Sequence, residues 1–413
     1  MPTAYKIYAQ PLMAKPIMAR KVVPTESPDD SPYAVPAQEY NFLSGVLPPG
    51  LTYTNSSTTR AYWDAAGTRQ AAAANVPIFE TLGGVLQGMR WEMEQRTNLA
   101  TNSEGAAATW STASNVTDAG TSITGFSASL AFGDNSVGRT AYKTAVTVDA
   151  TRYTISAFVQ MDDGLAPVVG INATSGDFSL VIEGDVATLN ATVQHIAGSL
   201  YRVSVGKVTV APISNNNGIL KYTTQSARTF RVAGIQLEAA ASASSYIQTA
   251  AAAVTRQPDV LTATAITPWY NQSEGTVLFE GIVADVSVIR GIFGFSDATG
   301  DQRNSGYIAA SAGTLVQLVN VSAVTQGQCV TANAVTAGSV FKSAFAYKAN
   351  AFANTLNGGT VAVDNVGTVP TVDRLRLGDR FPTLLSPFMG YARRFQYYNT
   401  RLPNAQTQGM SRV

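Results

Sequence analysis

Short runs in which apolar and polar residues alternate recur along most of this 413-residue chain, and they limit its fold more than any other feature. In RYTISAFVQM, residues 152–161, every second side chain is apolar, so these five share one face: Tyr153, Ile155, Ala157, Val159 and Met161. A period of two is typical of a strand with one buried face. The runs FSLVIEG, YRVSVGKVTV and FRVAGIQLE repeat the alternation between turns rich in Gly, Asn and Asp. The pattern predicts antiparallel β-sandwiches and an all-β protein.

Changes in composition divide the chain into four predicted parts. Residues 1–50 are rich in proline, and residues 51–96 read as short strands that form a small β module. Residues 97–254 predict a first sandwich and residues 255–413 a second one. Within the second, LNGGT from Leu356 to Thr360 predicts a hairpin, because Asn-Gly suits a type I′ turn.

The proline-rich arm, residues 1–50, has two interpretations. Proline fixes the backbone torsion and lacks an amide hydrogen, so the arm is expected to be extended and unable to form a core of its own. It is either a disordered tail or an ordered strap that lies along a partner protein. Its apolar residues favour the strap, and those expected to anchor it include Tyr5, Ile7, Tyr8, Leu12, Ile17 and Met18.

Composition excludes several classes of function. With 28 basic and 27 acidic residues, and only 13% charged residues in all, the surface is expected to be polar but uncharged, without attraction to nucleic acid. No run is apolar and long enough to predict membrane insertion. Cys329 is the only cysteine and His195 the only histidine, so an intrachain disulfide, a cysteine zinc cluster and any site with two histidines are excluded. We expect no cofactor and no metal, and a surface or strand-edge position for His195.

Several phrases, in order, resemble a known family. EQRTNLATNSEG at residues 94–105, then YTISAFVQ, YRVSV and FRVAGIQLEAAASASSYIQTAAAAVTRQPDV, resemble the carbohydrate-binding-module-like jelly roll of bacteriophage tail-fibre and other virion surface proteins. WYNQSEGTVLFEG, AFAYKANAFANTLNGGTVAVDN, LRLGDR and GYARRFQYYNTRLPNAQTQ resemble the concanavalin A-like (laminin-G-like) sandwich that often follows it. The resemblance implies a jelly roll over residues 97–254 and a concanavalin A-like sandwich over residues 255–413.

The resemblance also implies a role. Similar proteins are structural proteins of the virion exterior, of the fibre or receptor-binding type, and most often trimers. We expect the arm, residues 1–50, to attach to a head, neck or tail component, and the lectin-like sandwiches to bind host surface glycans. A structural decoration protein without glycan binding is the first alternative, and a polysaccharide depolymerase the second. Fold alone does not decide among them.

A pair of carboxylates invites an enzymatic interpretation. Glu92 and Glu94 lie two residues apart on one strand, roughly 7 Å by strand rise, near the separation found in inverting glycosidases. Both point the same way, so they cannot flank a sugar, and the neighbouring Arg90 and Arg96 predict an exposed charge ladder instead. We therefore predict no catalytic residue and no enzyme. Arg96 is expected to tie a joint between modules, with low exposure together with Leu99.

The most polar loop of the second sandwich, SDATGDQRNSGY from Ser296 to Tyr307, is the candidate glycan site. Its hydrogen-bonding residues are Asp297, Asp301, Arg303, Asn304 and Tyr307. The ring of Tyr307 is expected to stack on a sugar face. The alternative is a solvated hairpin tip, and the two aspartates lack the spacing of a calcium loop.

Overall fold

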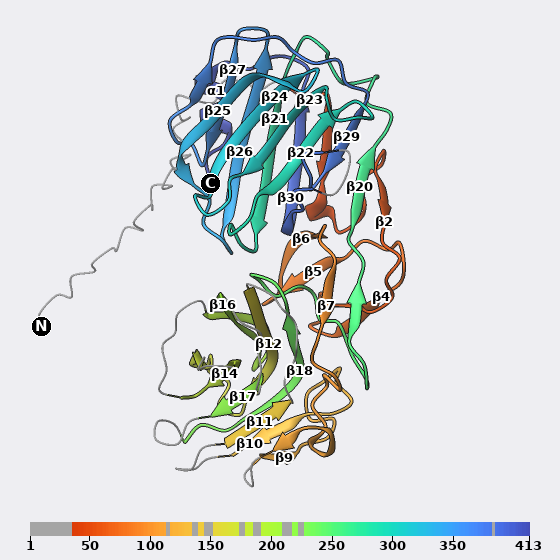
Figure 1. Ribbon diagram of the computed structural model, residues 1–413, viewed down its shortest axis with the longest axis vertical. Coiled ribbons are helices and arrows are strands. Elements are labelled where there is room, and N and C mark those ends of the chain that lie inside the picture. The colour runs from red at the N-terminus through yellow and green to blue at the C-terminus, as the bar shows by residue number, and fades with distance from the viewer. Residues whose placement is uncertain are drawn as a thin grey trace, which may run out of the picture. The chain divides into compact units, whose positions relative to one another are not determined.

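The structure of the protein is a computed structural model, and it describes most of the chain beyond residue 34. The described ranges are 35–112, 116–133, 139–143, 152–172, 178–184, 191–208, 217–221, 227–381 and 385–413. Regular structure in them is nearly all β-strand, so the protein is all-β, as the alternation predicts (Figure 1). Their helices are η1 (Phe42–Ser44), η2 (Ala107–Thr109) and α1 (Asn404–Met410), and none is long and apolar enough to cross a membrane. The predicted anchoring residues, Tyr5 to Met18, lie outside the described ranges.

The first sandwich consists of two sheets. Its six-stranded sheet has the order β15-β16-β12-β18-β10-β9, and its five-stranded sheet the order β13-β14-β17-β11-β8. The strands are β8 (Ser111–Thr112), β9 (Val116–Asp118), β10 (Leu130–Phe132), β11 (Arg139–Lys143), β12 (Arg152–Met161), β13 (Val169–Asn172), β14 (Phe178–Ile182), β15 (Ala191–Ala197), β16 (Leu200–Val208), β17 (Asn217–Lys221) and β18 (Phe230–Glu238). All pairings in them are antiparallel except that of β14 with β17.

The alternation in β12 has the predicted consequence. All five of its apolar residues, from Tyr153 to Met161, are at most 1% exposed and belong to one core between the sheets. The larger ones, such as Ile155, Val159 and Met161, each contribute about 1.5–3 kcal/mol when buried. The intervening residues of β12, such as Thr154 and Ser156, therefore point away from this core and form the other face of the six-stranded sheet.

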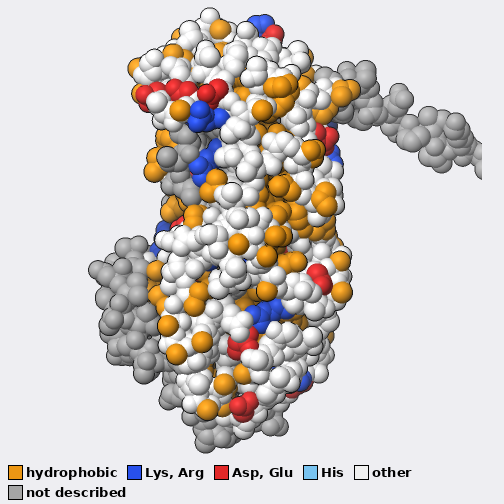
Figure 2. All heavy atoms as spheres, turned by 90° about the vertical axis from the view of Figure 1, so that its right-hand side faces the viewer, with side chains coloured by type: hydrophobic (Ala, Val, Ile, Leu, Met, Phe, Trp, Pro, Cys, Tyr) orange, Lys and Arg blue, Asp and Glu red, His pale blue; other side chains and the backbone are white. Residues whose placement is uncertain are grey.

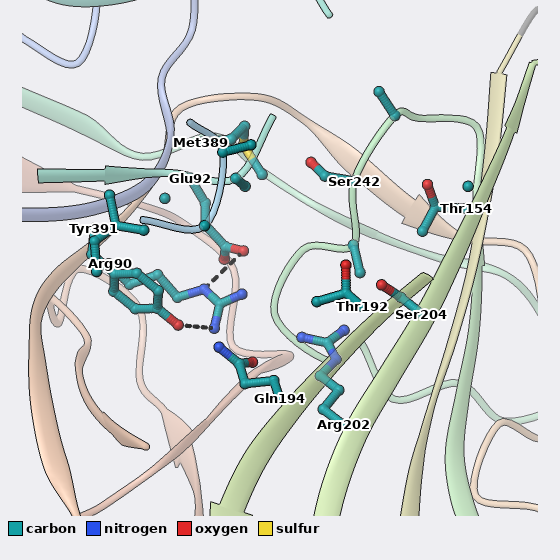
Figure 3. A pocket seen from close by; sticks show the side chains of 18 of the residues that line it. Arg90, Glu92, Thr154, Thr192, Gln194, Arg202, Ser204, Ser242, Met389 and Tyr391 are labelled. Carbon is teal, nitrogen blue, oxygen red and sulfur yellow. Dashed lines mark hydrogen bonds and ion pairs between the residues drawn. The ribbon is translucent and has the colours of Figure 1, made fainter. Parts of the chain in front are cut away.

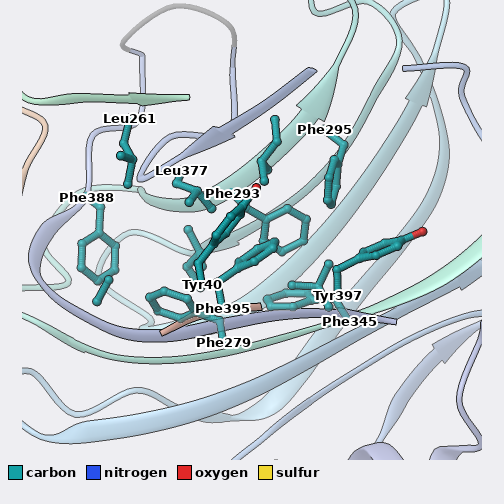
Figure 4. Close-up of a cluster of buried hydrophobic side chains, with 14 of the residues drawn as sticks. Tyr40, Leu261, Phe279, Phe293, Phe295, Phe345, Leu377, Phe388, Phe395 and Tyr397 are labelled. Atoms are coloured by element: carbon teal, nitrogen blue, oxygen red, sulfur yellow. The ribbon is translucent and has the colours of Figure 1, made fainter. Parts of the chain in front are cut away.

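The second sandwich also has two sheets. The first has the order β28-β27-β26-β21-β30-β6-β5, with β1 also paired to β30, and the second the order β2-β20-β29-β22-β23-β24-β25. The later strands are β20 (Val260–Ala263), β21 (Glu274–Val283), β22 (Arg290–Ser296), β23 (Arg303–Ile308), β24 (Thr314–Val321), β25 (Val324–Ala334), β26 (Val340–Lys348), β27 (Phe352–Leu356), β28 (Ala362–Asp364), β29 (Arg374–Leu377) and β30 (Met389–Tyr398). Aromatic rings fill the space between the sheets (Figure 4). The rings of Phe293 and Phe345, for example, meet edge to face with their centres 5.1 Å apart.

Strands from the start of the chain complete this second sandwich. They are β1 (Gln38–Asn41), β2 (Thr52–Thr54), β5 (Phe79–Leu82) and β6 (Val85–Glu92). Tyr40 of β1 is buried in the core and stacks on Phe395 at 5.9 Å. The predicted module of residues 51–96 therefore needs correction, because strands this short bury their apolar faces only by joining a larger sheet. Within it, β3 (Arg60–Trp63) and β4 (Arg69–Ala72) alone form a separate hairpin.

The first sandwich is thus inserted into the second. The chain passes from the second sandwich into the first through β7 (Arg96–Asn98) and returns to the second through β19 (Val254–Arg256). These two strands pair antiparallel with each other. Strand β6, which precedes the insertion, pairs with β30, near the end of the chain. The alanine-rich segment before β19 contains no helix.

The surface agrees with the composition. On the face shown in Figure 2, charged side chains are sparse and uncharged polar groups and backbone prevail, with apolar side chains scattered between them. A surface of this kind offers hydrogen bonds without a strong field.

Cys329 gives a direct test of the second core. It lies on β25, is 2% exposed, and burial raises the pKa of its thiol to about 12, with a further contribution from the charge of Asp364. Because the thiolate is the reactive form, we expect the native protein to react with a disulfide reagent at pH 8 at least about 100-fold more slowly than the chain unfolded in guanidinium chloride. Thiol release followed by absorbance reports this single cysteine, and equal rates would contradict its burial.

Candidate binding cleft between the two sandwiches

The loop predicted to bind glycan does not present its residues together. Asp297 accepts hydrogen bonds from Thr299 and from the amide of Gly300, so it organises the turn between β22 and β23, and Asp301 is exposed beside it. The other three predicted residues, Arg303, Asn304 and Tyr307, belong to β23 and are buried.

Tyr307 does not offer its ring to a sugar. The guanidinium of Arg380 lies 4.5 Å from the centre of this ring, and that of Arg303 lies 4.2 Å from the ring of Phe381. Because Phe381 in turn contacts Arg380, cations and aromatic rings alternate and cover each other. The ring of Tyr307 is therefore covered rather than open to a sugar, contrary to the prediction. The positions of Asp297 and Asp301 fit the alternative prediction of a hairpin tip.

The charges around Glu92 form a buried joint rather than the predicted exposed ladder. Glu92 is 2% exposed, and its carboxylate contacts Nε of Arg90 at 3.1 Å and Nε of Arg256 at 3.5 Å. It also accepts hydrogen bonds from the amide and hydroxyl of Ser245, in the segment that follows β18. Although burial opposes ionisation, the two guanidinium groups and Ser245 hold the pKa of Glu92 well below its usual range. Glu92 therefore ties the inserted sandwich to β6.

The prediction that Arg96 is buried and ties a joint between modules is confirmed. Arg96 is 4% exposed and donates to the carbonyl of Ser242 at 3.2 Å and to the carboxylate of Glu94 at 3.0 Å. Arg290 of β22 contacts the same carboxylate at 3.1 Å. Leu99 is half-buried against the first core.

Beside this joint lies a pocket of about 300 Å³ between the two sandwiches. Its floor is the face of the six-stranded sheet that points away from the first core. The floor residues are Thr154, Thr192, Gln194, Arg202, Ser204 and Gly206. Cross-strand pairing places Thr192 opposite Ser204, and Gln194 opposite Arg202. Hydroxyl, amide and guanidinium groups therefore gather on one surface (Figure 3).

The opposite wall comes from the second sandwich. Arg90 projects from β6 and Tyr391 from β30, and both line the pocket. The carboxylate of Glu80 accepts hydrogen bonds from the guanidinium of Arg90 and, at 2.5 Å, from the hydroxyl of Tyr391. Although burial opposes its charge, Glu80 and Glu92 raise the pKa of Arg90. On this wall the carboxylate of Glu80 therefore neutralises Arg90 and fixes the positions of Arg90 and Tyr391.

Arg202 is the pocket's other cation, and its surroundings differ. It is 8% exposed, its guanidinium lies 5.3 Å from the ring centre of Phe158, and it donates one hydrogen bond of 3.3 Å to the hydroxyl of Ser156. Burial, and then the charge of Arg90, lower the pKa of Arg202, although the charges of Glu238, Glu80 and Glu92 act in the opposite direction. It remains a cation, because no protein environment removes the proton from arginine near neutral pH.

Glu92 and His195, two side chains able to exchange protons, differ in burial and position. Glu92 is held ionised by its partners, so it is a poor proton donor near neutral pH. His195 lies exposed on the edge strand β15, where its Nε2–H donates to the carbonyl oxygen of Gly198 at 2.9 Å. Among the described residues, no three His, Cys, Asp or Glu side chains cluster in a way that would hold a metal ion.

No family model matches this chain. No curated protein is similar enough in sequence to count as a relative either. Solved structures similar to part of the chain include the CBM40 module of the Ruminococcus gnavus IT-sialidase bound to α2,3-sialyllactose, with 19% identity, 35% of this chain and 84% of that chain covered, and a TM-score of 0.31. Another is domain 4 of AbnA, an extracellular arabinanase of Geobacillus stearothermophilus, in complex with arabinotriose, with 13% identity, 42% and 81% covered, and a TM-score of 0.29. Each of these similarities covers less than half of this chain.

Sequence reasoning missed this cleft. The polar face of ATVQHIAGSLYRVSV carried a signal, because Thr192, Gln194, Arg202 and Ser204 alternate with apolar residues and fall on one side of a predicted strand pair. Nothing local showed that a second sandwich closes over that side.

Proposed function

We propose that this protein is a non-enzymatic carbohydrate-binding protein of a virion exterior and that the cleft between its sandwiches is its binding site. The observation that carries the proposal is the cleft floor, where the side chains of Thr192, Gln194 and Ser204 line one pocket. Saccharides are recognised by hydrogen bonds to many hydroxyl groups, and hydroxyl and amide side chains both donate and accept such bonds. A pocket of about 300 Å³ lies at the lower end of the range of small-molecule sites, which suits one or two sugar rings.

The virion placement rests on the sequence resemblance to phage fibre and receptor-binding proteins. In this proposal the protein attaches to a head, neck or tail component through a segment within residues 1–50. The chains assemble as a homotrimer. Residues 38–41 of that segment already form β1 of the second sandwich, so the attachment falls to residues before them.

A glycan array tests the proposal with the full chain. Replacing Thr192 with tryptophan fills the cleft from its floor and is expected to lower glycan binding at least about 10-fold, because a bulky side chain displaces the ligand. Val193→Trp is the matched control, since Val193 is the next residue of the same strand, points to the opposite face and is 41% exposed. Tyr307→Ala is expected to leave binding unchanged.

Three results would contradict the proposal. Glycan binding that survives Thr192→Trp would exclude the cleft as the site. A wild-type protein that binds no glycan would favour the structural decoration protein. Release of reducing ends from a bound polysaccharide would show an enzyme.

A further inference from the structure

Arg202 is a buried cation in the cleft without a carboxylate partner. A guanidinium group carries five N–H donors, and in the described chain that of Arg202 contacts one hydroxyl, on Ser156, and one aromatic face, on Phe158. Its Nε has no hydrogen-bond partner in those ranges. No carboxylate of the described residues lies within ion-pair distance of it.

The other buried arginines at the joint, unlike Arg202, have carboxylate partners. Each contacts at least one carboxylate: Arg60 with Asp259, Arg90 with Glu80 and Glu92, Arg96 with Glu94, Arg256 with Glu92, and Arg290 with Asp285 and Glu94. A buried charge without a partner is costly, because it has lost water without gaining a counter-charge. The fold satisfies this requirement throughout the joint but leaves Arg202 unpaired at the floor of a pocket.

The direction of Arg202 points to a ligand. Figure 3 shows its guanidinium extending from β16 into the pocket, with Gln194, Thr192 and Ser204 around it. Arg90 is less suited to this role, because Glu80 and Glu92 neutralise its charge through its Nη1 and Nε atoms. The remaining donors of Arg202 therefore face the pocket beside a surface of hydroxyl and amide groups.

We infer that the cleft selects an acidic saccharide, a hexuronate or a sialate, whose carboxylate binds the guanidinium of Arg202. This inference rests on the proposed function and names the class of its ligand. The fork of N–H groups on arginine matches the two oxygens of a carboxylate, and such charge-assisted bonds are shorter and stronger than neutral ones. Thr192, Gln194 and Ser204 lie beside that fork and hydrogen-bond the ring hydroxyls.

Calorimetric titration of the full chain tests the inference with matched probes. The acidic probes are methyl glucuronoside and methyl sialoside, and the neutral probe is methyl glucoside, which differs from the first only at the carboxylate. We expect the acidic probe that fits to bind at least about 10-fold more tightly than the glucoside, as for a hydrogen-bonded charge. Arg202→Gln is expected to abolish this preference and leave the weak affinity for the glucoside, whereas Arg202→Lys retains part of it.

Stability and a control variant separate ligand binding from a structural role. Because Arg202 has no carboxylate partner, Arg202→Gln is expected to leave the thermal midpoint unchanged or to raise it, whereas a structural ion pair would lower it. Arg231→Gln removes a partly exposed cation of the same sandwich, which pairs with Asp162, and is expected to change neither the acidic preference nor the thermal midpoint.

The outcomes distinguish the two proposals. Equal affinities for the acidic and neutral probes, or an acidic preference that survives Arg202→Gln, would overturn the inference and leave carbohydrate binding in place. Failure of the protein to bind any saccharide, on the array as well as in solution, would overturn both. A thermal midpoint lowered by Arg202→Gln, with the acidic preference unchanged, would assign Arg202 to the fold.

Discussion

Replacing Glu92 with glutamine is expected to lower the free energy of unfolding by about 3–5 kcal/mol, the usual effect of removing one partner from a buried ion pair. The carboxylate is 2% exposed, lies between the guanidinium groups of Arg90 and Arg256, and accepts two hydrogen bonds from Ser245. Glutamine keeps the shape but removes the charge, so each of the two arginines loses one buried counter-charge. Chemical denaturation at pH 7 measures the difference.

Glu39→Gln is the matched control. Glu39 pairs with Arg394, but both side chains are more than one-third exposed, so the substitution is expected to change stability by less than about 1 kcal/mol. A comparable loss in the two variants would contradict the role assigned to burial.

The effect of Glu92 should also depend on pH. Its pKa in the folded protein is held below the ordinary value of 4.5, so its stabilisation is fully present above that pH and is lost as the pH falls further. The difference between the wild type and Glu92→Gln should therefore shrink by about 1.4 kcal/mol for each pH unit below 4.5. A constant difference between pH 7 and pH 3 would contradict the lowered pKa.

Gly88→Ala is expected to cost about 4 kcal/mol, because it combines a strained backbone with a direct clash. Gly88 lies in β6 with φ of +117°, and a Cβ atom there would lie 2.2 Å from the carbonyl oxygen of Ala392 in β30. Neither atom can move without breaking the pairing of the two strands. Gly84 is the control, since it has φ of +79° and open space around it, so Gly84→Ala carries the backbone strain alone, about 1–2 kcal/mol. Equal losses in the two variants would exclude the close approach.

Local structure was predictable because its causes are local. The side-chain period of two in residues 152–161 assigned the five buried residues of β12 correctly. The phrase LNGGT predicted the hairpin between β27 and β28, where Asn357 and Gly358 have φ of 51° and 68°. In both cases the residues that determine the conformation are neighbours in the sequence.

Sheet membership was not predictable in the same way. The runs that form β1, β2, β5 and β6 carry the strand period but no information on the partner strand, which lies far away in the sequence. Their number and length suggested a separate module, whereas the larger sheets of the second sandwich bury them better. Long-range pairing of this kind depends on the whole chain.

The candidate site shows the same limit. The polar run ending at Tyr307 looked like an open loop, because Arg380 and Phe381, which cover Arg303 and Tyr307, come more than 70 residues later. The polar face that includes Arg202 was visible in the sequence, but the burial of Arg202 was not, since a single arginine on a strand usually faces water. Its significance comes from the second sandwich, which encloses it without supplying a carboxylate.

The insertion of one sandwich into the other sets the order in which the chain can fold as it is made. Met389 of β30 pairs with Glu92 of β6, about 300 residues earlier. At about 5–20 residues per second, a ribosome needs roughly 15–60 s to supply that partner. The inserted sandwich is complete within this interval, while β1 and β6 wait with unpaired edges of the kind that aggregate. Synthesis therefore exposes these edges for a time set by the roughly 300 residues between the two strands, about half of which belong to the inserted sandwich.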